Sequence, residues 1–559
     1  LNLIEVRKMQ KNAIEENINL KGSTIGEYLF EKLSALGVEY SFGIPGDFVL
    51  PLYKVQQNSK IKTVVVTHEP SAGFAADAYA RVKGIGVAIV TYGVGALNMV
   101  NPIALAYAEK SPVVVISGAP GLKERETNAL LHHQVKTYES QMKIFEEITE
   151  ETVILDDQFT AADEIDRVLQ TCRKLSRPVY IEVPRDMVNR KILFHRGITE
   201  KPKTCDLETL EEAITESLEM INNSKHPAIL AGVEAHRFGL QKELIEFAEK
   251  TGIPVSETLL GKSVFPGQHP LYLGVYAGAM SSDVIKEYIE TSDCLIMIGV
   301  MLTDMNLGLF TAKLEQSKII FASEENIIIK HHHYPNICFS DFFNNLISKV
   351  KERKKIEFPR VNNLKPPKTR NHITMQDIIY IINNFIDKDT IIITDVGDCM
   401  FSCIDLRTPE HTTFLAPAYY ESMGFSVPGA IGAQLASYRR PLVVLGDGAF
   451  QMTGMEISTA KRLGLNPMVM VLNNGCYATL RSMNKEINCL DIAQWNYAEI
   501  AKLLGGNGYV VDTAQQFRDA LKDAKAKKDF SIIDVHIDKE DISPALLKLS
   551  EEWKKRVKM

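Results

Sequence analysis

The chain repeats one pattern three times: short runs of β-branched and aliphatic residues alternate with longer amphipathic stretches. This alternation is typical of parallel α/β domains, because parallel strands are joined by helical crossovers. The predicted strands of the first repeat are VEYSFGI, KTVVVTH, GVAIVTYG, SPVVVISG and PVYIEVP. Those of the later repeats are HPAILAGV, GIPVSETLL, DCLIMIGV and SKIIFAS, then DTIIITDVG, RPLVVLGDG and NPMVMVLNN. The sequence therefore predicts three doubly wound α/β domains with parallel sheets.

Segments rich in charge and proline separate these repeats. A chain of 559 residues is too long for one hydrophobic core, which also favours several domains. The predicted domains cover residues 21–190, 205–350 and 372–545. The stretch beginning KERKKIEFPR is the predicted linker, 351–371. Residues 1–20 are expected to be an N-terminal extension and 546–559 a C-terminal tail.

Composition narrows the classes of partner. A net charge of −7 without a basic stripe makes nucleic acids and anionic membranes poor candidates, so small molecules are expected. The eight cysteines lack a short-spaced framework, and no zinc pattern stands out; this indicates reduced thiols and a cytoplasmic location. The histidines at 331–333 are interpreted as a surface stretch, and Cys399 and Cys403 as packing residues on one helix face.

Two predicted strands end in residues that suit a metal and a phosphate. PLVVLGDG ends at Gly446, Asp447 and Gly448, and MVMVLNN ends at Asn474, 27 residues after Asp447. The carboxyl ends of parallel strands meet at one edge of a sheet, where open α/β sheets bind ligands. Carboxylate and amide oxygens suit Mg²⁺, and backbone N–H groups of a glycine turn can receive phosphate oxygens.

A GDG turn followed by NN at this spacing resembles the thiamine diphosphate enzyme superfamily, and the resemblance covers residues 24 to 545. It implies a pyrimidine-binding, a middle and a diphosphate-binding domain. It also implies that Asp447, Asn474 and the carbonyl of Cys476 hold Mg²⁺, while the backbone of Gly448 and Ala449 meets the diphosphate. Further cofactor contacts are implied at Gly397, Asp398, Gly446 and Tyr477.

The same resemblance assigns three residues around the cofactor ring. THEPSAGFAADAYARVKG matches the family's helix start, which makes Glu69 the glutamate that pairs with the pyrimidine; taken alone, Glu69 is a first-turn helix acid. In YYESMGF, Met423 falls where the family bends the cofactor, and Glu421 where a backbone carbonyl meets the aminopyrimidine. The family joins the two cofactor halves across a subunit boundary, which implies at least a homodimer and commonly a dimer of dimers.

Three further strings narrow the branch: SFGIPGDFVLPLYKV with Asp47, VTYGVGALNMVNPIALAYAEKSPVVVISGAPG, and LLHHQV with His132 and His133. Adjacent histidines with a distant aspartate mark the simple 2-keto acid decarboxylases, where they transfer protons. Without that context the histidines read as a polar loop. The resemblance is closest to phenylpyruvate and indolepyruvate decarboxylases.

One departure concerns the substrate pocket. Pyruvate decarboxylases have a glutamate in the helix after NN, whereas NNGCYATL places Leu480 there. An aliphatic wall favours an aryl or long alkyl substrate. As a hypothesis, Asp304 in GVMLTDMN partly replaces the missing acid; its alternative role is to cap the next helix.

The expected function is non-oxidative decarboxylation of a phenylpyruvate or indolepyruvate type of 2-keto acid. By resemblance it proceeds through a thiamine diphosphate ylide and an enamine, with Mg²⁺ as the metal, and yields an aldehyde and CO₂. The alternatives are a branched-chain 2-keto acid or pyruvate decarboxylase and a carboligase. A protein that binds the cofactor only for assembly is an alternative from another class.

Overall fold

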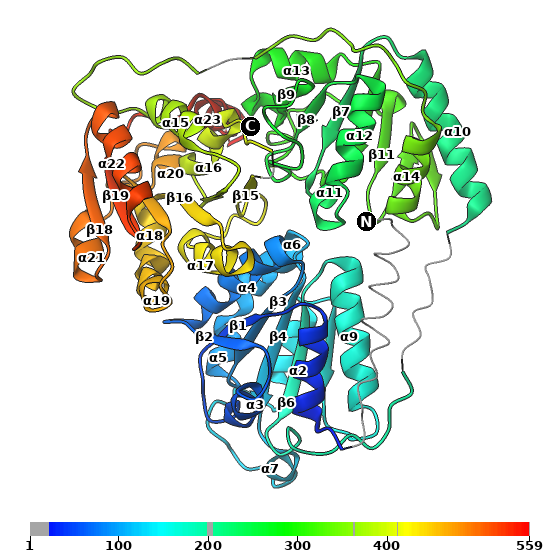
Figure 1. The fold of residues 1–559 in the computed structure, drawn as a ribbon, viewed down its shortest axis with the longest axis vertical. Helices are drawn as coiled ribbons and strands as arrows, with labels where there is room; N and C mark the ends of the chain where they lie inside the picture. The colour runs from blue at the N-terminus through cyan, green and yellow to red at the C-terminus, as the bar shows by residue number, and fades with distance from the viewer. Residues whose placement is uncertain (1–21, 198–204, 362–363, 411, 558–559) are drawn as a thin grey trace. The chain divides into compact units, whose positions relative to one another are not determined.

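The computed structural model describes residues 22–197, 205–361, 364–410 and 412–557, so the extension predicted for 1–20 lies outside the described residues. The chain forms two compact units (Figure 1). One holds the described residues up to 197 together with Ile431–Tyr438, and the other holds the rest. Among the helices of the described segments, none has the length and apolar character that crossing a membrane requires.

The first unit is built on a six-stranded sheet in the order β2-β1-β3-β4-β6-β5, and every pairing in it is parallel. The strands are β1 (Tyr40–Gly43), β2 (Lys62–Val65), β3 (Gly86–Val90), β4 (Val113–Ala119), β5 (Glu151–Ile154) and β6 (Val179–Pro184). The helices are α2 (Ile25–Ala35), α3 (Leu50–Gln56), α4 (Glu69–Lys83), α5 (Val94–Asn98), α6 (Val100–Ala108), α7 (Leu122–Glu126), α8 (Ser140–Glu146) and α9 (Ala161–Leu175).

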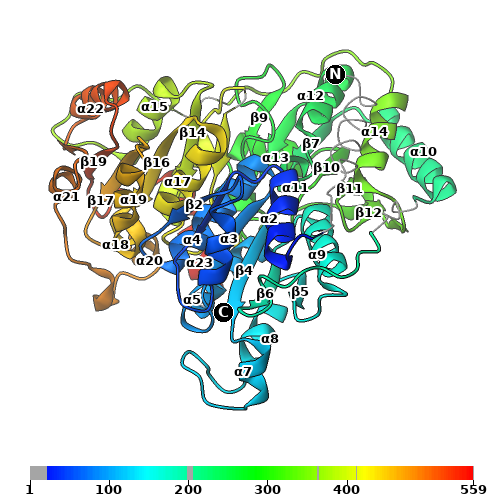
Figure 2. The same ribbon diagram turned by 60° about the horizontal axis from the view of Figure 1, so that its bottom comes forward.

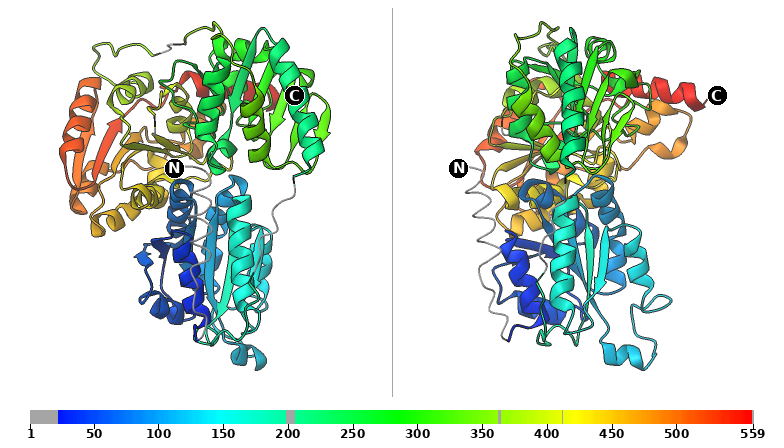
Figure 3. Two further views of the ribbon diagram at one scale, coloured as in Figure 1. Left: turned by 45° about the vertical axis from the view of Figure 1, so that its right-hand side comes forward. Right: turned by 90° about the vertical axis from the view of Figure 1, so that its right-hand side faces the viewer.

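Helices cover both faces of this sheet (Figure 3). Helices α2, α3 and α9 pack together on one face, over a core that includes Val87 and Ile89 of β3. Helices α4 and α6 pack on each other and α4 lies along β1 and β3. Successive strand residues point to opposite faces, so a strand covered on both sides is apolar throughout, and all five residues of β3 are buried.

Helix α4 brings Glu69 to the carboxyl edge of the first sheet. It follows β2 closely, begins at Glu69 with a proline in its first turn, and ends at Gly84 in the left-handed conformation (φ 99°). Proline is pre-organised for the first turn and glycine tolerates the left-handed end, so the sequence sets both limits of the helix. Its residues from Ser71 to Arg81 are all buried.

The second unit contains two sheets, the first with seven strands in the order β13-β12-β11-β10-β7-β8-β9. These are β7 (Pro227–Ala231), β8 (Val255–Glu257), β9 (Tyr272–Val275), β10 (Cys294–Ile298), β11 (Ile319–Ala322), β12 (Ile327–Ile329) and β13 (His332–Tyr334). Its helices are α10 (Leu207–Asn223), α11 (Val233–Arg237), α12 (Gln241–Thr251), η1 (Gly278–Met280), α13 (Asp283–Glu290), η2 (Gln316–Lys318) and α14 (Phe339–Lys349).

The prediction of a wholly parallel sheet is wrong at one edge of this sheet. Strand β12 pairs antiparallel with β11, and it also pairs antiparallel with β13, with which it forms a tight hairpin in which Lys330 has a positive φ of 53°. The remaining pairings are parallel. The histidines at 331–333 are exposed on this hairpin, which confirms their assignment to the surface.

The second sheet of this unit has six parallel strands in the order β15-β14-β16-β17-β19-β18. These are β14 (Thr390–Thr394), β15 (Thr413–Leu415), β16 (Arg440–Gly446), β17 (Met468–Asn473), β18 (Asn507–Val511) and β19 (Ser531–His536). Its helices are α15 (Met375–Phe385), α16 (Asp398–Phe401), η3 (Ser402–Asp405), α18 (Asp447–Thr453), η4 (Gly454–Glu456), α19 (Ile457–Arg462), α20 (Ala478–Met483), η5 (Asn488–Leu490), α21 (Tyr497–Leu503), α22 (Ala514–Ala526) and α23 (Pro544–Val557). Helix α17 (Ser426–Ser437) begins in this unit, and its residues from Ile431 on belong to the first unit.

The three sheets confirm the predicted class, three α/β domains with parallel or mostly parallel sheets. Each sheet lies within one predicted domain, while the domain boundaries stay predictions. Helix α23, red in Figure 3, continues through the predicted tail, and its Ala545, Leu546 and Leu549 are buried in the core of the last sheet.

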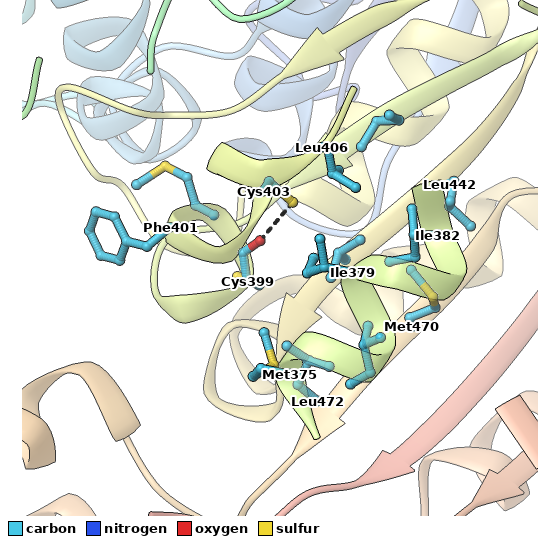
Figure 4. Close-up of a cluster of buried hydrophobic side chains, with 14 of the residues drawn as sticks. Met375, Ile379, Ile382, Cys399, Phe401, Cys403, Leu406, Leu442, Met470 and Leu472 are labelled. Carbon is cyan, nitrogen blue, oxygen red and sulfur yellow. Dashed lines mark hydrogen bonds between the residues drawn. The ribbon is translucent and has the colours of Figure 1, made fainter. Parts of the chain in front are cut away.

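Cys399 and Cys403 belong to this same core (Figure 4). Both are buried, and the Cys403 thiol donates to the Cys399 carbonyl oxygen at 3.0 Å. Aliphatic side chains of α15, β16 and β17, including Ile379 and Leu442, surround them. Burial raises the pKa of the Cys403 thiol to about 12, so it stays protonated. Their interpretation as packing residues is confirmed.

Candidate functional site

Asp447 is the centre of the predicted metal site in the second unit. It is the first residue of α18, directly after β16, and its side chain is buried. One carboxylate oxygen accepts from the Gly448 N–H at 2.8 Å; the other accepts from the N–H groups of Asn474 and Gly475, at 3.1 and 2.6 Å. The carboxylate therefore joins the ends of β16 and β17, as their parallel pairing requires.

Burial raises the pKa of Asp447 to about 6, although the three backbone N–H groups act in the opposite direction. Opposite it, Asn474 turns its side-chain oxygen towards its own loop and accepts from the Cys476 N–H at 3.1 Å. A carboxylate and an amide oxygen next to each other form the hard oxygen donor set that Mg²⁺ takes. The position of a Cβ on Gly446 has no atom within 4 Å, so the turn has room beside the carboxylate. These residues fit Mg²⁺ and a diphosphate.

Tyr477 and Cys476 shape the other side of this turn. A Cβ on Gly448 would lie 2.6 Å from the Tyr477 ring, so only glycine allows the ring to pack there. The Cys476 carbonyl accepts from the Ala478 N–H at 3.0 Å as α20 begins. Ala449 is buried in the first turn of α18. The cofactor roles of these residues stay predictions.

Asp395 is a residue that the sequence analysis missed. It directly follows β14 and is fully buried, and it accepts hydrogen bonds from Gly424 N–H at 2.9 Å and from Ser426 N–H and hydroxyl at 2.9 and 2.7 Å. Burial raises the pKa of Asp395, although these hydrogen bonds act to lower it. Asp395 thereby fastens the loop that carries Met423, which is half-buried, and Glu421, which has a strained φ of 57°. The sequence did offer a signal for Asp395: an aspartate at the end of a predicted strand and two residues before Gly397.

Gly397 and Asp398 follow on the same edge. Gly397 has a φ of 116°, which side chains rarely adopt, and starts α16. Asp398 accepts from the Ser543 N–H at 2.8 Å and from its hydroxyl, so it caps the start of α23. Burial raises the pKa of Asp398 to about 6 despite these bonds.

Glu69 lies in the first unit, half-buried at the start of α4. Its carboxylate accepts from the Asn98 side chain at 3.0 Å, and a Cβ on Gly95 would lie 3.6 Å from it. The segment from Thr91 to Asn98 therefore lines one side of Glu69. The Thr91 hydroxyl is buried without a hydrogen-bond partner among the described residues, which leaves a polar group for a ligand.

The three predicted proton-transfer residues meet in the same unit. The His132 Nε2 and Asp47 Oδ2 atoms are 2.7 Å apart, and the rings of His132 and His133 lie 4.7 Å apart. Phe48 stacks on His132. Burial alone would raise the pKa of Asp47, but the hydrogen bond and charge of His132, the Phe48 N–H and the charge of His133 together lower it below its usual value. The structure thus brings together residues from two distant strings.

A ligand atom from each of these three residues lies within 4.8 Å of the others, a spacing that could also hold a metal ion. The hydrogen bond between His132 and Asp47 favours proton transfer instead, because it orients the imidazole and supplies a charge partner. The His133 Nδ1 atom is buried and has no partner within the described segments.

The loop that carries both histidines follows α7, which lies at the tip of the first unit (Figure 2). His133 has a φ of 67°, and a Cβ on Gly93 would lie 2.2 Å from the His133 carbonyl oxygen, so the two backbones are in close contact. The Gly93 N–H in turn donates a hydrogen bond to the side-chain oxygen of the buried Gln141 at 2.6 Å.

A buried polar network supports Gln141, and it too was missed from sequence. The Gln141 amide donates to Ser117 Oγ and Tyr180 OH at 3.0 and 2.5 Å. Tyr180 donates to Glu182 at 2.9 Å, and Arg125 donates to the same carboxylate at 2.6 Å. Burial raises the pKa of Glu182 although Arg125 lowers it. These contacts join four distant segments, so no local pattern reveals them.

We expect Gln141→Met to lower kcat by about tenfold and the free energy of unfolding by about 1–3 kcal/mol. The buried Gly93 N–H loses its acceptor, and the backbone of Gly93 then no longer holds His133 in a fixed position. Steady-state kinetics and urea unfolding measure the two effects. The matched control is Gln56→Met, another fully buried glutamine, which bonds Ser41 instead. An equal loss of kcat in both variants would contradict a specific role for Gln141.

The two predicted pocket residues lie in the second unit. Leu480 is 51% exposed on α20, directly after the NN loop. Asp304 lies in a series of turns after β10, where its carboxylate accepts from its own neighbour, Met305 N–H, at 2.9 Å. The described segment 299–315 consists of turns and irregular structure, and no helix follows Asp304 before η2. The alternative that Asp304 caps the next helix is therefore wrong. A pocket role for either residue stays a prediction.

Comparisons with known proteins match these features. Three family models fit the chain: the thiamine pyrophosphate enzyme N-terminal TPP binding domain over residues 23–144, the central domain over 214–340, and the C-terminal TPP binding domain over 395–535. Thiamine pyrophosphate is another name for thiamine diphosphate. Asp47, Glu69 and both histidines fall in the first match, and Asp447 and Asn474 in the third.

Similar proteins extend over most of the chain. An indole-3-pyruvate decarboxylase of Azospirillum brasilense is 36% identical, over 95% of this chain and 98% of its own length. A putative pyruvate decarboxylase of Schizosaccharomyces pombe is 33% identical, over 86% and 88%. A pyruvate decarboxylase of Kluyveromyces marxianus is 30% identical, over 87% and 89%.

Proposed function

Since the chain belongs to the thiamine pyrophosphate enzyme family, in which it is a thiamine diphosphate-dependent 2-keto acid decarboxylase, we propose that its substrate has a bulky aromatic side chain, as in phenylpyruvate and indolepyruvate. The products are the corresponding aldehyde and CO₂. The observation that carries the substrate class is the 36% identity to an indole-3-pyruvate decarboxylase over nearly the whole of both chains. Leu480 supports it, because an aliphatic residue replaces an acid there.

When bound, thiamine diphosphate supplies the electron sink that makes loss of CO₂ from a 2-keto acid possible. Asp447, Asn474 and the Cys476 carbonyl would hold Mg²⁺, and the glycine turn at Gly448 would receive the diphosphate. Glu69 would hold a proton at its carboxylate, where Asn98 fixes one oxygen at 3.0 Å. That bond orients the carboxylate.

Asp47, His132 and His133 would supply the proton that replaces CO₂. The His132 Nε2 and Asp47 Oδ2 atoms lie 2.7 Å apart, and this hydrogen bond keeps the imidazole oriented for proton transfer. The unpartnered Nδ1 of His133 can bind the substrate carboxylate or the product oxygen. Both histidines therefore handle protons rather than hold a metal.

The test of the substrate class is CO₂ release from phenylpyruvate, indolepyruvate, 2-ketoisocaproate and pyruvate by one preparation with Mg²⁺ and thiamine diphosphate. We expect the two aromatic acids to give the highest kcat/KM. A higher value for 2-ketoisocaproate or pyruvate would assign the chain to the branched-chain or pyruvate enzymes, and acyloin formation would indicate a carboligase. Cofactor binding without turnover of any acid would indicate an assembly protein.

Leu480→Glu is expected to shift preference towards small keto acids. One methylene group in an apolar pocket changes selectivity by about 10–200-fold, so an acid in place of leucine should lower kcat/KM for phenylpyruvate relative to pyruvate by at least about tenfold. The measurement is the ratio of the two constants. Leu503→Glu, at another exposed leucine of this unit, is the control. An unchanged ratio in Leu480→Glu would contradict the pocket role.

We also propose Mg²⁺ as the metal and a homodimer as the smallest complete unit, with a dimer of dimers as the larger form. The family's placement of the two cofactor halves on neighbouring subunits supports this. Sedimentation equilibrium of the protein with Mg²⁺ and cofactor tests it, and a monomer that retains full activity would overturn it.

A further inference from the structure

A second group of metal-ligating side chains lies in the second unit and takes no part in the proposed decarboxylation. Cys205, Cys338 and Asp341 are all half-buried, and one ligand atom of each lies within 4.8 Å of the other two. Zn–S bonds of about 2.3 Å place two sulfur atoms of a tetrahedral shell about 3.8 Å apart, so this spacing is compatible with one ion.

Two helix starts hold these side chains together. Cys338 is the N-cap residue of α14, and Asp341 is the third residue of that helix. Cys205 precedes Asp206, the N-cap of α10, whose carboxylate accepts from Glu208 N–H at 3.1 Å and from Thr209 N–H at 3.2 Å. The Asp206 N–H donates to the Asn336 carbonyl at 3.0 Å, which joins the two starts, and α10 packs along α14.

The chemistry of this donor set favours a soft cation. Thiolates bind Zn²⁺ and other soft metals, whereas Mg²⁺ prefers oxygen ligands. Thiolate is the form of cysteine that binds metal, and Cys338 lies at the N-terminal end of α14, the positive end of the helix dipole. Two thiolates and one carboxylate leave one position of a tetrahedral shell, which a water molecule can fill.

We propose that Cys205, Cys338 and Asp341 form a Zn²⁺ site that ties the start of α10 to the start of α14. Binding forms two Zn–S bonds and one Zn–O bond and releases one proton from each thiol. The ion adds no redox step. A ligand that binds only the folded state stabilises it, so Zn²⁺ should raise the melting temperature of the second unit. This site does not depend on the proposed decarboxylation.

The probe is Co²⁺, which reports thiolate coordination by a charge-transfer band. The reduced full-length protein, saturated with Mg²⁺ and thiamine diphosphate, is titrated with Co²⁺. We expect one equivalent to produce the band and Zn²⁺ to abolish it. Cys338→Ser and Cys205→Ser should each lose it, and Asp341→Asn should bind Co²⁺ at least about tenfold more weakly. Cys489→Ser, at an exposed cysteine elsewhere in the chain, should retain it.

Absence of the band in the reduced wild type would overturn the proposal, as would its persistence in both serine variants. If oxidation removes two titratable thiols while the reduced protein binds no Co²⁺, the pair is a disulfide site and the proposal is wrong. Asp341→Asn keeps the test decisive if a serine variant fails to fold. Because the substrate panel measures CO₂ and this titration measures thiolate coordination, failure of one leaves the other standing.

Discussion

Glu69→Gln is expected to lower kcat for phenylpyruvate by about 10²–10⁴-fold while the protein stays folded, the range expected when a positioned acid or base is removed. Glutamine keeps the size of the side chain and an oxygen that can accept from Asn98, so α4 should begin as before. It cannot hold a transferable proton in the same way. Steady-state kinetics gives the loss, and thermal melting and calorimetric titration with thiamine diphosphate show whether fold and cofactor binding remain.

The matched control for this variant is Glu27→Gln in the same unit. Glu27 is also a first-turn helix acid, and it forms a capping box with Thr24 that glutamine can preserve. Its kcat should equal that of the wild type. Near-normal turnover by Glu69→Gln would show that Glu69 only complements the helix dipole and would remove it from the proposed site.

Asp447→Ala is expected to weaken Mg²⁺-dependent binding of thiamine diphosphate by at least about 100-fold, because loss of even an outer-shell partner costs 10–100-fold in metal affinity. Activity should fall with the occupancy of the cofactor. The variant also leaves the N–H groups of Asn474 and Gly475 without their acceptor, so the melting temperature should fall as well. Calorimetric titration with cofactor, at saturating and at zero Mg²⁺, separates the metal effect from the fold.

Asp377→Asn is the control for burial of an aspartate in the same core. Asp377 is buried at the start of α15, where its side chain caps the helix. This variant should lose some stability and keep wild-type cofactor affinity. If Asp447→Ala binds the cofactor as tightly as the wild type in the presence of Mg²⁺, the assignment of the GDG turn to metal binding is wrong.

The buried parallel strands were predictable because each is a continuous apolar run bounded by turn residues, as in β4 and β16. Strand β5 and the edge strands β9, β15 and β18 were missed, and so was β19, which pairs between β17 and β18. Runs of three to six residues carry few positions from which a period can be recognised. The β12–β13 hairpin was missed for the same reason, and with it the antiparallel edge.

In the candidate site, too, some residues were predictable from the sequence and others were not. Asp447 and Asn474 were found because each directly follows a strand, and strand ends of a parallel sheet share an edge. Gln141, Glu182 and Asp395 were missed because their partners lie far away in sequence: Gln141 bonds Gly93, and Asp395 bonds Gly424 and Ser426. A buried polar side chain reveals its role only through its partners.

By itself the sequence determined the α/β class, the limits of α4, and the motifs that assign the chain to its family, because these depend on local periodicity, capping and short spacings. Only the tertiary structure decided which distant residues meet: Asp47 with His132, Gln141 with Gly93, and Cys205 with Cys338 and Asp341. The reason is physical. Helix and strand preferences act over a few neighbouring residues, whereas contacts between side chains far apart in the chain exist only once the sheets and helices have packed.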